Sequence, residues 1–160
     1  MSPSRVGFGF DVHPFLDGDA SGRRLMLGGV EFPGEIPLAG HSDADVIAHA
    51  IGDALLGAVG LGDLGMHFPD TDPTWHGADS IGILRGCLDL VEAAGFHLVN
   101  ADCTVVCERP KIAPMREQMI ELLTTVTGAP VHVKATRPEG LGSLGRVEGI
   151  ACMAVVLVES

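Results

Sequence analysis

The sequence predicts an α/β fold in which helices pack on a β-sheet. Segments with the two-residue alternation typical of strands are interspersed with segments that carry the 3.6-residue periodicity of amphipathic helices. No internal repeat or low-complexity tract interrupts the 160 residues. A chain of this length suits one domain and can bury about 70% of its unfolded surface, so we expect a single domain over residues 1–160.

The N-terminal part of the chain predicts two extended segments. Residues 5–11 (RVGFGFD) form the first strand, with Val6, Phe8 and Phe10 on one face. Residues 25–32 (LMLGGVEF) form a second strand, or the arms of a hairpin that bends at its glycines.

A helix is expected to open within residues 41–45 (HSDAD), capped by Ser42 or Asp43. Its apolar stripe consists of Val46, Ile47, Ala50, Ile51, Ala54, Leu55 and Ala58. Residues 60–76 lack periodicity and are rich in turn residues, which predicts a long loop with a functional role.

The remaining elements continue the alternation. A helix over residues 79–94 ends at Gly95. This helix is followed by a strand over 97–108, a helix over most of 110–126, and strands over 131–136 and 150–159. The last strand (IACMAVVLVE) is apolar enough to be buried on both faces, either inside the sheet or at a subunit interface.

Charge and composition exclude several classes of protein. Ten Lys and Arg against 21 Asp and Glu give a formal net charge of −11, which argues against general nucleic-acid binding and against docking on an acidic membrane. An anionic substrate would then require a metal ion or local backbone donors. Because the N-terminus resembles no signal peptide and no apolar run is long enough to span a bilayer, we expect a soluble, cytoplasmic protein.

The cysteines predict no disulfide framework. Cys87, Cys103, Cys107 and Cys152 lie in apolar stretches without a CxxC pair. We interpret them as buried, reduced thiols, and a metal-binding pair of Cys103 and Cys107 is the less favoured alternative.

Asp11 and His13 form the first candidate site. They lie two residues apart at a strand end, so their side chains point to the same side, where a carboxylate and an imidazole suit a divalent metal. His49, in the middle of the predicted helix, is the natural third ligand, because an Asp/His/His set with an open fourth position is typical of catalytic zinc. The alternative is a solvated pair and an unrelated histidine. Asp45 and Asp53, each four residues from His49, are hypothesised to orient its ring.

Two further segments could bind a phosphorylated polyol. His41 and Ser42 precede a predicted helix N-terminus, which attracts phosphate, and Ser42 is equally suited to ordinary capping. Short acidic and hydroxyl residues in segments 63–65 (DLG) and 68–72 (FPDTD) could hold a polyol, or only fix the loop through Asx turns.

Two charged turns that contain proline could take a nucleotide. They are residues 108–111 (ERPK) and 136–139 (TRPE), with Arg146 beyond them. Glu139 could ligate magnesium beside phosphates. Each segment alone is otherwise read as a solvated turn.

Together these segments resemble one known family. GFGFDVHPF, LAGHSDADVIAHAIGDALLGAVGLGDLG, FPDTDP, GADS, RPK, VKAT and GRVEGIAC are similar to motifs of the 2-C-methyl-D-erythritol 2,4-cyclodiphosphate synthases, over residues 5–158. The resemblance implies a homotrimer of α/β subunits, each with a four-stranded mixed sheet and helices on one face, with active sites between subunits. It implies that the 2-phosphate of 4-diphosphocytidyl-2-C-methyl-D-erythritol 2-phosphate attacks the β-phosphorus. CMP is then released and a cyclic diphosphate closes, a step of the non-mevalonate isoprenoid pathway.

The resemblance also implies roles for individual residues. Zinc is held by Asp11, His13 and His49, and a phosphate-bridging magnesium or manganese ion by Glu139. His41 stabilises the transition state. The implied substrate-binding residues are Asp11, Val12, His13, His41, Ser42, Asp63, Leu64, Gly65, Phe68, Pro69, Asp70, Thr71 and Asp72 for the diphosphate and erythritol, and Cys107, Glu108, Arg109, Pro110, Lys111, Ile112, Ala113, Thr136, Arg137, Pro138, Glu139 and Arg146 for the nucleotide and its phosphates.

One departure from the family concerns its threonine run, Ala-Thr-Thr-Thr-Glu, which here reads ATRPE over residues 135–139. Arg137 stands in the place of the middle threonine, which stabilises the transition state. An arginine there could contact phosphate bidentately, Thr136 could serve instead, or the rate is reduced, so His41, Thr136 and Arg137 are the predicted catalytic residues. Ser143 replaces a phenylalanine of the family. Two other functions stay open: a zinc phosphoesterase that hydrolyses the diphosphate, and a non-catalytic trimer that binds isoprenoid phosphates.

Overall fold

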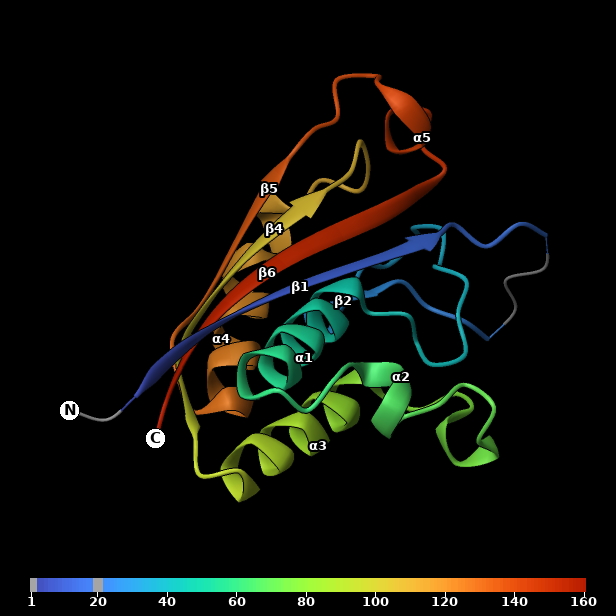
Figure 1. Cartoon of the computed structure of the whole chain (residues 1–160). Coiled ribbons are helices and arrows are strands. Elements are labelled where there is room, and N and C mark those ends of the chain that lie inside the picture. Colours follow the sequence, from blue (N-terminus) through green and yellow to red (C-terminus); the bar gives the residue numbers. More distant parts are fainter. Residues whose placement is uncertain (1–2, 19–21) are drawn as a thin grey trace.

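Four strands form one mixed sheet at the centre of the computed structural model, which describes residues 3–18 and 22–160 (Figure 1). In spatial order they are β1 (Ser4–Pro14), β6 (Gly149–Glu159), β4 (His97–Val106) and β5 (Val131–Thr136). β6 is antiparallel to both β1 and β4, whereas β4 and β5 are parallel. Therefore β1, β4 and β5 run in one direction, and their C-terminal ends lie at the same end of the sheet. The expected four-stranded mixed sheet is confirmed.

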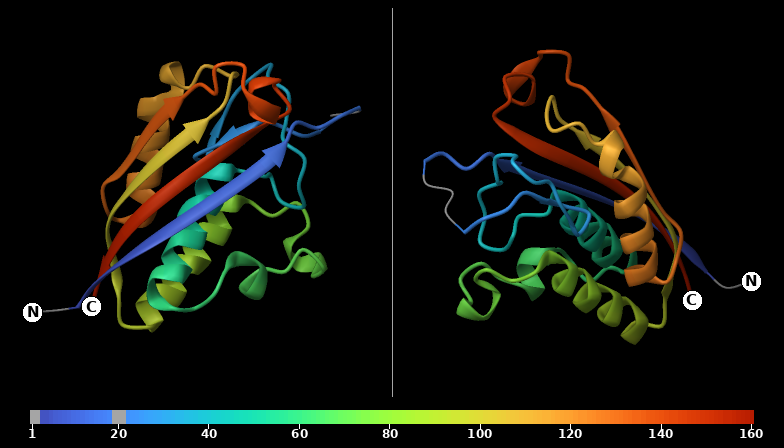
Figure 2. Two further views of the ribbon diagram at one scale, coloured as in Figure 1. Left: turned by 45° about the horizontal axis from the view of Figure 1, so that its top comes forward. Right: turned by 180° about the vertical axis from the view of Figure 1, so that it is seen from behind.

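The long helices cover one face of this sheet, as expected. They are α1 (Val46–Val59), α3 (Ser80–Ala93) and α4 (Arg116–Thr127). α1 packs on β1 and β6, α4 packs on β5, and α3 packs against α1, so the helices lie on the same side in both views of Figure 2. Apolar side chains of α1 such as Ile47, Ile51 and Leu55 are fully buried in the core between these layers.

Two glycines in β1 allow α1 to lie directly on the strand. A Cβ on Gly7 would overlap the carbonyl oxygen of Ala54, and one on Gly9 would overlap that of Ala50. Because side chains alternate across a strand, the apolar residues that alternate with the glycines point to the other side of the sheet, where Phe8 and Phe10 are 61% and 49% exposed. The apolar face of this strand therefore points away from the helices.

The second predicted extended segment is a hairpin. β2 (Met26–Leu27) and β3 (Val30–Glu31) pair antiparallel around Gly28 and Gly29, whose φ angles are 58° and 75°. Both positive angles favour glycine, as the type of tight turn here requires.

The first long helix begins later than predicted. α1 starts at Val46, and its cap is Asp45, whose carboxylate accepts hydrogen bonds from the backbone N–H groups of Ile47 (3.0 Å) and Ala48 (3.2 Å). The prediction of Ser42 or Asp43 as the cap was therefore wrong. Ala44 has a φ of 59°, which no helical residue adopts, so the preceding segment is not helical.

Other boundaries also differ from the expected ones. The expected loop over residues 60–76 contains a short helix α2 (Leu64–His67) and a 3₁₀ helix η1 (Pro73–Trp75). A second 3₁₀ helix, η2 (Ala113–Met115), precedes α4, so the helix expected from residue 110 starts at Arg116. A short α5 (Gly142–Gly145) connects β5 to β6.

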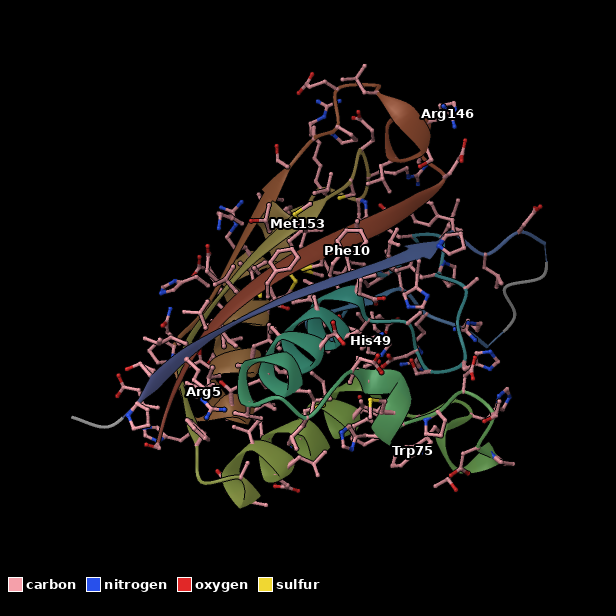
Figure 3. All side chains as sticks on the ribbon, in the orientation of Figure 1. Arg5, Phe10, His49, Trp75, Arg146 and Met153 are labelled. Carbon is pink, nitrogen blue, oxygen red and sulfur yellow. The ribbon has the colours of Figure 1, made fainter. Side chains whose placement is uncertain are left out.

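β6 is covered on one face only in the single chain. Met153 and Val155 are 40% and 45% exposed, on the side where Figure 3 labels Met153 and Phe10. Burial on both faces inside the monomer was therefore wrong, and a subunit interface remains the open reading of this strand. In the described part of the chain, no helix is both long and apolar enough to cross a bilayer.

Candidate functional site

Asp11, His13 and His49 meet between β1 and α1. Asp11 and His13 lie near the C-terminal end of β1, and His49 lies on α1 near α2 (Figure 3). Asp11 Oδ2 is 3.2 Å from His13 Nε2 and 3.1 Å from His49 Nδ1. One ligand atom from each residue lies within 4.8 Å of the others, and no other such group occurs in residues 3–18 and 22–160. The structure thus brings the predicted metal ligands together.

The protonation of His13 suits a metal ligand. Its Nδ1 is 2.7 Å from the carbonyl oxygen of Ala39, which can only accept, so Nδ1 donates this hydrogen bond. In the neutral ring Nε2 then keeps the lone pair that a metal needs, and in the protonated ring Nε2–H can donate to Asp11. Burial lowers the pKa of His13, but the hydrogen bond and charge of Asp11 outweigh it, so this pKa is raised. Burial raises the pKa of Asp11, yet both histidines hold it well below its usual range. The site therefore holds an anionic oxygen between two imidazole nitrogens, a donor set that fits zinc.

The hypothesis that Asp45 or Asp53 orients His49 was wrong. Besides capping α1, Asp45 accepts hydrogen bonds from the N–H groups of Gly28 and Gly29 at 2.9 and 2.7 Å, which ties the hairpin to the helix. Asp53 accepts from the N–H of Leu64 at 3.3 Å. The ring of His49 instead contacts serine hydroxyls.

A cavity of 450 Å³ opens beside the three ligands. The predicted substrate residues that line it are His41, Ser42, Leu64, Gly65, Phe68, Pro69 and Asp70. Trp75, labelled in Figure 3, and Ile83 form its apolar wall, and the ring of Trp75 packs edge-on against Phe68 with centroids 5.0 Å apart. The His41 imidazole is exposed, with Nε2 3.7 Å from Asp70 Oδ2. The cavity thus places an imidazole and a hydroxyl close to the candidate cation ligands.

Other predicted residues of this group have local structural contacts. Asp63 caps α2 by accepting from Met66 N–H at 3.0 Å, and Asp72 caps η1 by accepting from Thr74 N–H at 2.9 Å. These are the turn contacts that the sequence left open as the alternative. Thr71 is not among the residues that line the cavity, and Val12 lies on the exposed face of the sheet.

The idea that a helix N-terminus binds phosphate needs a correction. The N–H groups of Ile47 and Ala48 at the start of α1 are already bonded to Asp45. His41 and Ser42 lie before that cap, so any grip on an anion must come from their own side chains rather than from the helix end.

A second group of predicted residues lines two adjoining cavities of 350 and 370 Å³. The first is lined by Cys107, Glu108, Pro110, Lys111, Ile112, Ala113, Thr136 and Arg137, and the second adds Arg109 and Glu139. Neither shares a lining residue with the cavity at the cation ligands. The described chain therefore carries two separate groups of predicted site residues, both at the end of the sheet where β1, β4 and β5 finish.

Arg137 is engaged by a carboxylate of this second group. Its Nε and Nη2 donate to Glu108 Oε2 at 3.0 and 2.9 Å, and Glu108 Oε1 accepts from the N–H of Gly140 at 2.7 Å. The Gly140 bond and the Arg137 bonds lower the pKa of Glu108. Arg146 pairs with Glu148 at 2.6 Å, and Pro138 lies in the turn after β5.

The cysteines are buried and free, as predicted. Burial raises the pKa of Cys87 to about 12 and that of Cys107 to about 11. In the described ranges Cys103 and Cys107 belong to no group of three or more possible metal ligands, so the interpretation as buried thiols is the one that the structure favours.

Sequence reasoning missed two residues behind His49, Ser80 and Asp43, and the wall residues Trp75 and Ile83. Ser80 belongs to the GADS segment and Asp43 to HSDAD, so both were in view. A serine at the start of a helix and an aspartate before one resemble ordinary caps, and only the packing of α3 on α1 brings them to the ring.

The fold and site define an α/β protein with a candidate cation site of two histidines and one carboxylate at the end of its sheet. The chain belongs to the YgbB family, which matches residues 4–159. It is 53% identical over 159 residues to the 2-C-methyl-D-erythritol 2,4-cyclodiphosphate synthase of Geobacter sulfurreducens, which covers 97% of this chain and 98% of that protein. It is 56% identical to a bifunctional enzyme IspD/IspF of an Anaeromyxobacter species, matching 98% of this chain but spanning only 40% of that relative's length.

Solved structures give the same relationship. The bifunctional IspDF from Campylobacter jejuni superposes with a TM-score of 0.92 at 38% identity, covering 99% of this chain and 43% of that chain. A CDP-bound 2C-methyl-D-erythritol-2,4-cyclodiphosphate synthase superposes with a TM-score of 0.85 at 38% identity, covering 96% and 99%. A CDP complex of IspF from Plasmodium falciparum superposes with a TM-score of 0.82 at 32% identity, covering 98% and 96%.

Proposed function

We propose that this chain converts 4-diphosphocytidyl-2-C-methyl-D-erythritol 2-phosphate to 2-C-methyl-D-erythritol 2,4-cyclodiphosphate, with release of CMP. The observation that carries the proposal is the convergence of Asp11, His13 and His49 at a cavity that His41 and Ser42 also line. Membership of the family, and relatives of nearly equal length that bear this activity in their names, support the same reaction.

Asp11, His13 and His49 would hold zinc, because a carboxylate and two imidazoles leave a fourth position open. When bound, the ion supplies positive charge that polarises a phosphate oxygen. A chain with a net charge of −11 needs such charge to bind a polyanion. The Asp11 carboxylate and the Ala39 carbonyl keep His13 oriented for this role.

The reacting groups belong to one molecule, so the protein's main task is to hold them in line. The exposed imidazole of His41 and the Ser42 hydroxyl are placed to donate hydrogen bonds to the diphosphate. Glu139 offers one carboxylate, and magnesium or manganese commonly takes one or two carboxylates together with phosphate oxygens. Arg137 offers two N–H donors that leave Glu108 when a phosphate competes for them.

Three copies of the chain would complete each site. The metal half-site and the nucleotide half-site share no residue in one chain, and assembly would set the metal half of one copy against residues 107–113 of the next. The exposed apolar face of β1 and β6, formed by Val6, Phe8, Phe10, Val12, Met153 and Val155, supplies the surface for that assembly. Four free thiols favour a reducing compartment, the cytoplasm.

The test is product analysis by ³¹P NMR and nucleotide chromatography with zinc- and magnesium-loaded protein and the cytidyl substrate. We expect CMP and a cyclic diphosphate in equal amounts. Linear phosphates would instead establish the phosphoesterase, and no CMP release would leave only a binding protein.

A further inference from the structure

Ser80 and Asp43 lie behind His49, on the side of its ring away from Asp11. His49 Nε2 is 2.9 Å from the Ser80 hydroxyl, whereas Nδ1 is 3.1 Å from Asp11 Oδ2. Ser80 is fully buried at the start of α3, and its hydroxyl donates to the Asp43 carboxylate. A continuous chain of contacts thus leads from Asp43 through Ser80 to Nε2 of the imidazole, whose other nitrogen, Nδ1, faces the candidate cation site.

The chemistry of Asp43 fixes the direction of donation along this chain. A carboxylate only accepts, so the single proton of the Ser80 hydroxyl points to Asp43. Towards His49 the hydroxyl oxygen then offers lone pairs alone, and the imidazole must present Nε2–H. A neutral imidazole carries one N–H, so Nδ1 keeps the lone pair that a cation beside Asp11 needs.

Asp43 is itself held in place by backbone donors. It accepts from the N–H of Asp45 at 3.3 Å and from the N–H of Ser80 at 3.3 Å, and so bridges the entry to α1 and the start of α3. The Ser42 hydroxyl also lies near Nε2, at 3.3 Å, and accepts from the N–H of Ala44 at 3.1 Å. Ser80 is the closer partner of the ring, and it is the one whose proton is committed to a carboxylate.

We infer that Ser80, held by Asp43, is a positioning residue that fixes the ring orientation of His49 and keeps its proton on Nε2, so that Nδ1 is available to the metal. This inference rests on the metal site of the proposed function and adds two residues outside the ligand set. Each histidine then has an acceptor for the ring N–H that does not face the metal: the Ala39 carbonyl for His13 and the Ser80 hydroxyl for His49.

The test measures zinc binding by full-length, metal-free protein in competition with a chromogenic chelator, with no substrate present. We expect Ser80→Ala to weaken zinc binding about 10- to 100-fold, the range found when partners of metal-ligating histidines are removed. Asp43→Asn, almost the same in shape, can donate to Ser80 and turn its hydroxyl proton towards His49, so a smaller loss is expected. Asp79→Ala is the matched control, because Asp79 caps the same helix through Ile81 N–H at 3.1 Å. It should lower the melting temperature and leave zinc affinity unchanged.

A second readout is the position of the ring proton, read from long-range ¹H–¹⁵N spectra of the zinc-loaded protein. His49 should carry its proton on Nε2. Unchanged zinc affinity in Ser80→Ala, an equal loss in Asp79→Ala, or a proton on Nδ1 would each overturn the inference. If Ser80→Ala does not fold, Asp43→Asn decides, and native affinity there overturns it. A protein that binds zinc in this way but forms no cyclic product would refute the proposed function alone.

Discussion

The exposed face of the sheet gives a direct test of the proposed trimer. In the strand register Phe8 lies opposite Val155 and Phe10 opposite Met153, so two cross-strand apolar pairs face outward. Phe8 is 61% exposed, and a phenylalanine buries roughly 200 Å², so an interface over it would remove roughly 120 Å² from water in each copy. At about 25 cal/mol per Å², this one side chain contributes about 3 kcal/mol per copy, or about 9 kcal/mol per trimer.

Phe8→Asp removes that contribution and adds a carboxylate that an interface would have to desolvate. We expect the native protein to sediment as a trimer and the variant as a monomer that still folds, since the position is exposed in the single chain. Thr125→Asp, on the exposed side of α4, is the control and should remain a trimer. A native protein that sediments as a monomer, or a Phe8→Asp variant that remains trimeric and fully active, would refute the reasoning.

Four other changes test the site and the fold. His49→Ala should lose the metal and lower CMP release by about 10³-fold or more, measured with metal analysis, because a catalytic ion supplies several kcal/mol. Gly9→Ala should destabilise the fold by about 1–3 kcal/mol in urea, since its Cβ would overlap a backbone carbonyl of α1. Asp11 raises the pKa of His13 more than burial lowers it. Without metal, the interaction between protonated His13 and Asp11 therefore stabilises the fold fully below about pH 6.5, the ordinary pKa of histidine. This contribution is lost as the pH rises through the raised pKa of His13. The urea stability difference between native and His13→Gln protein should therefore shrink at higher pH. Arg137→Thr should lower turnover by about tenfold if the guanidinium contacts phosphate, and a faster variant would contradict that role.

Much of the fold was predictable because it follows from local pattern. The alternation over residues 5–11 and the apolar stripe of α1 gave the right elements, and Asp11 and His13 fell on one side of a strand as their spacing requires. The motif resemblance supplied the four-stranded mixed sheet. The strand order was not predicted, because local periodicity does not determine which strands pair.

What failed depended on contacts between distant segments. A left-handed Ala44 moved the start of α1, and no local signal for that angle exists in an alanine. Asp45 was a predicted partner of His49 because it lies four residues away, but its carboxylate oxygens accept hydrogen bonds from the N–H groups of Gly28 and Gly29 in the hairpin. Ser80 reaches the ring only because α3 packs on α1, 31 residues along the chain from His49.

The candidate cation ligands join the first strand to a helix 38 residues further along the chain, so an ion bound there would also be a cross-link. An unfolded chain cannot assemble these three donors, and ligand linkage then makes stability a function of free zinc, worth about 2.7 kcal/mol at a concentration 100 times the dissociation constant. The melting temperature should climb with added zinc, and a cell short of the metal would hold a population that opens and is degraded more readily.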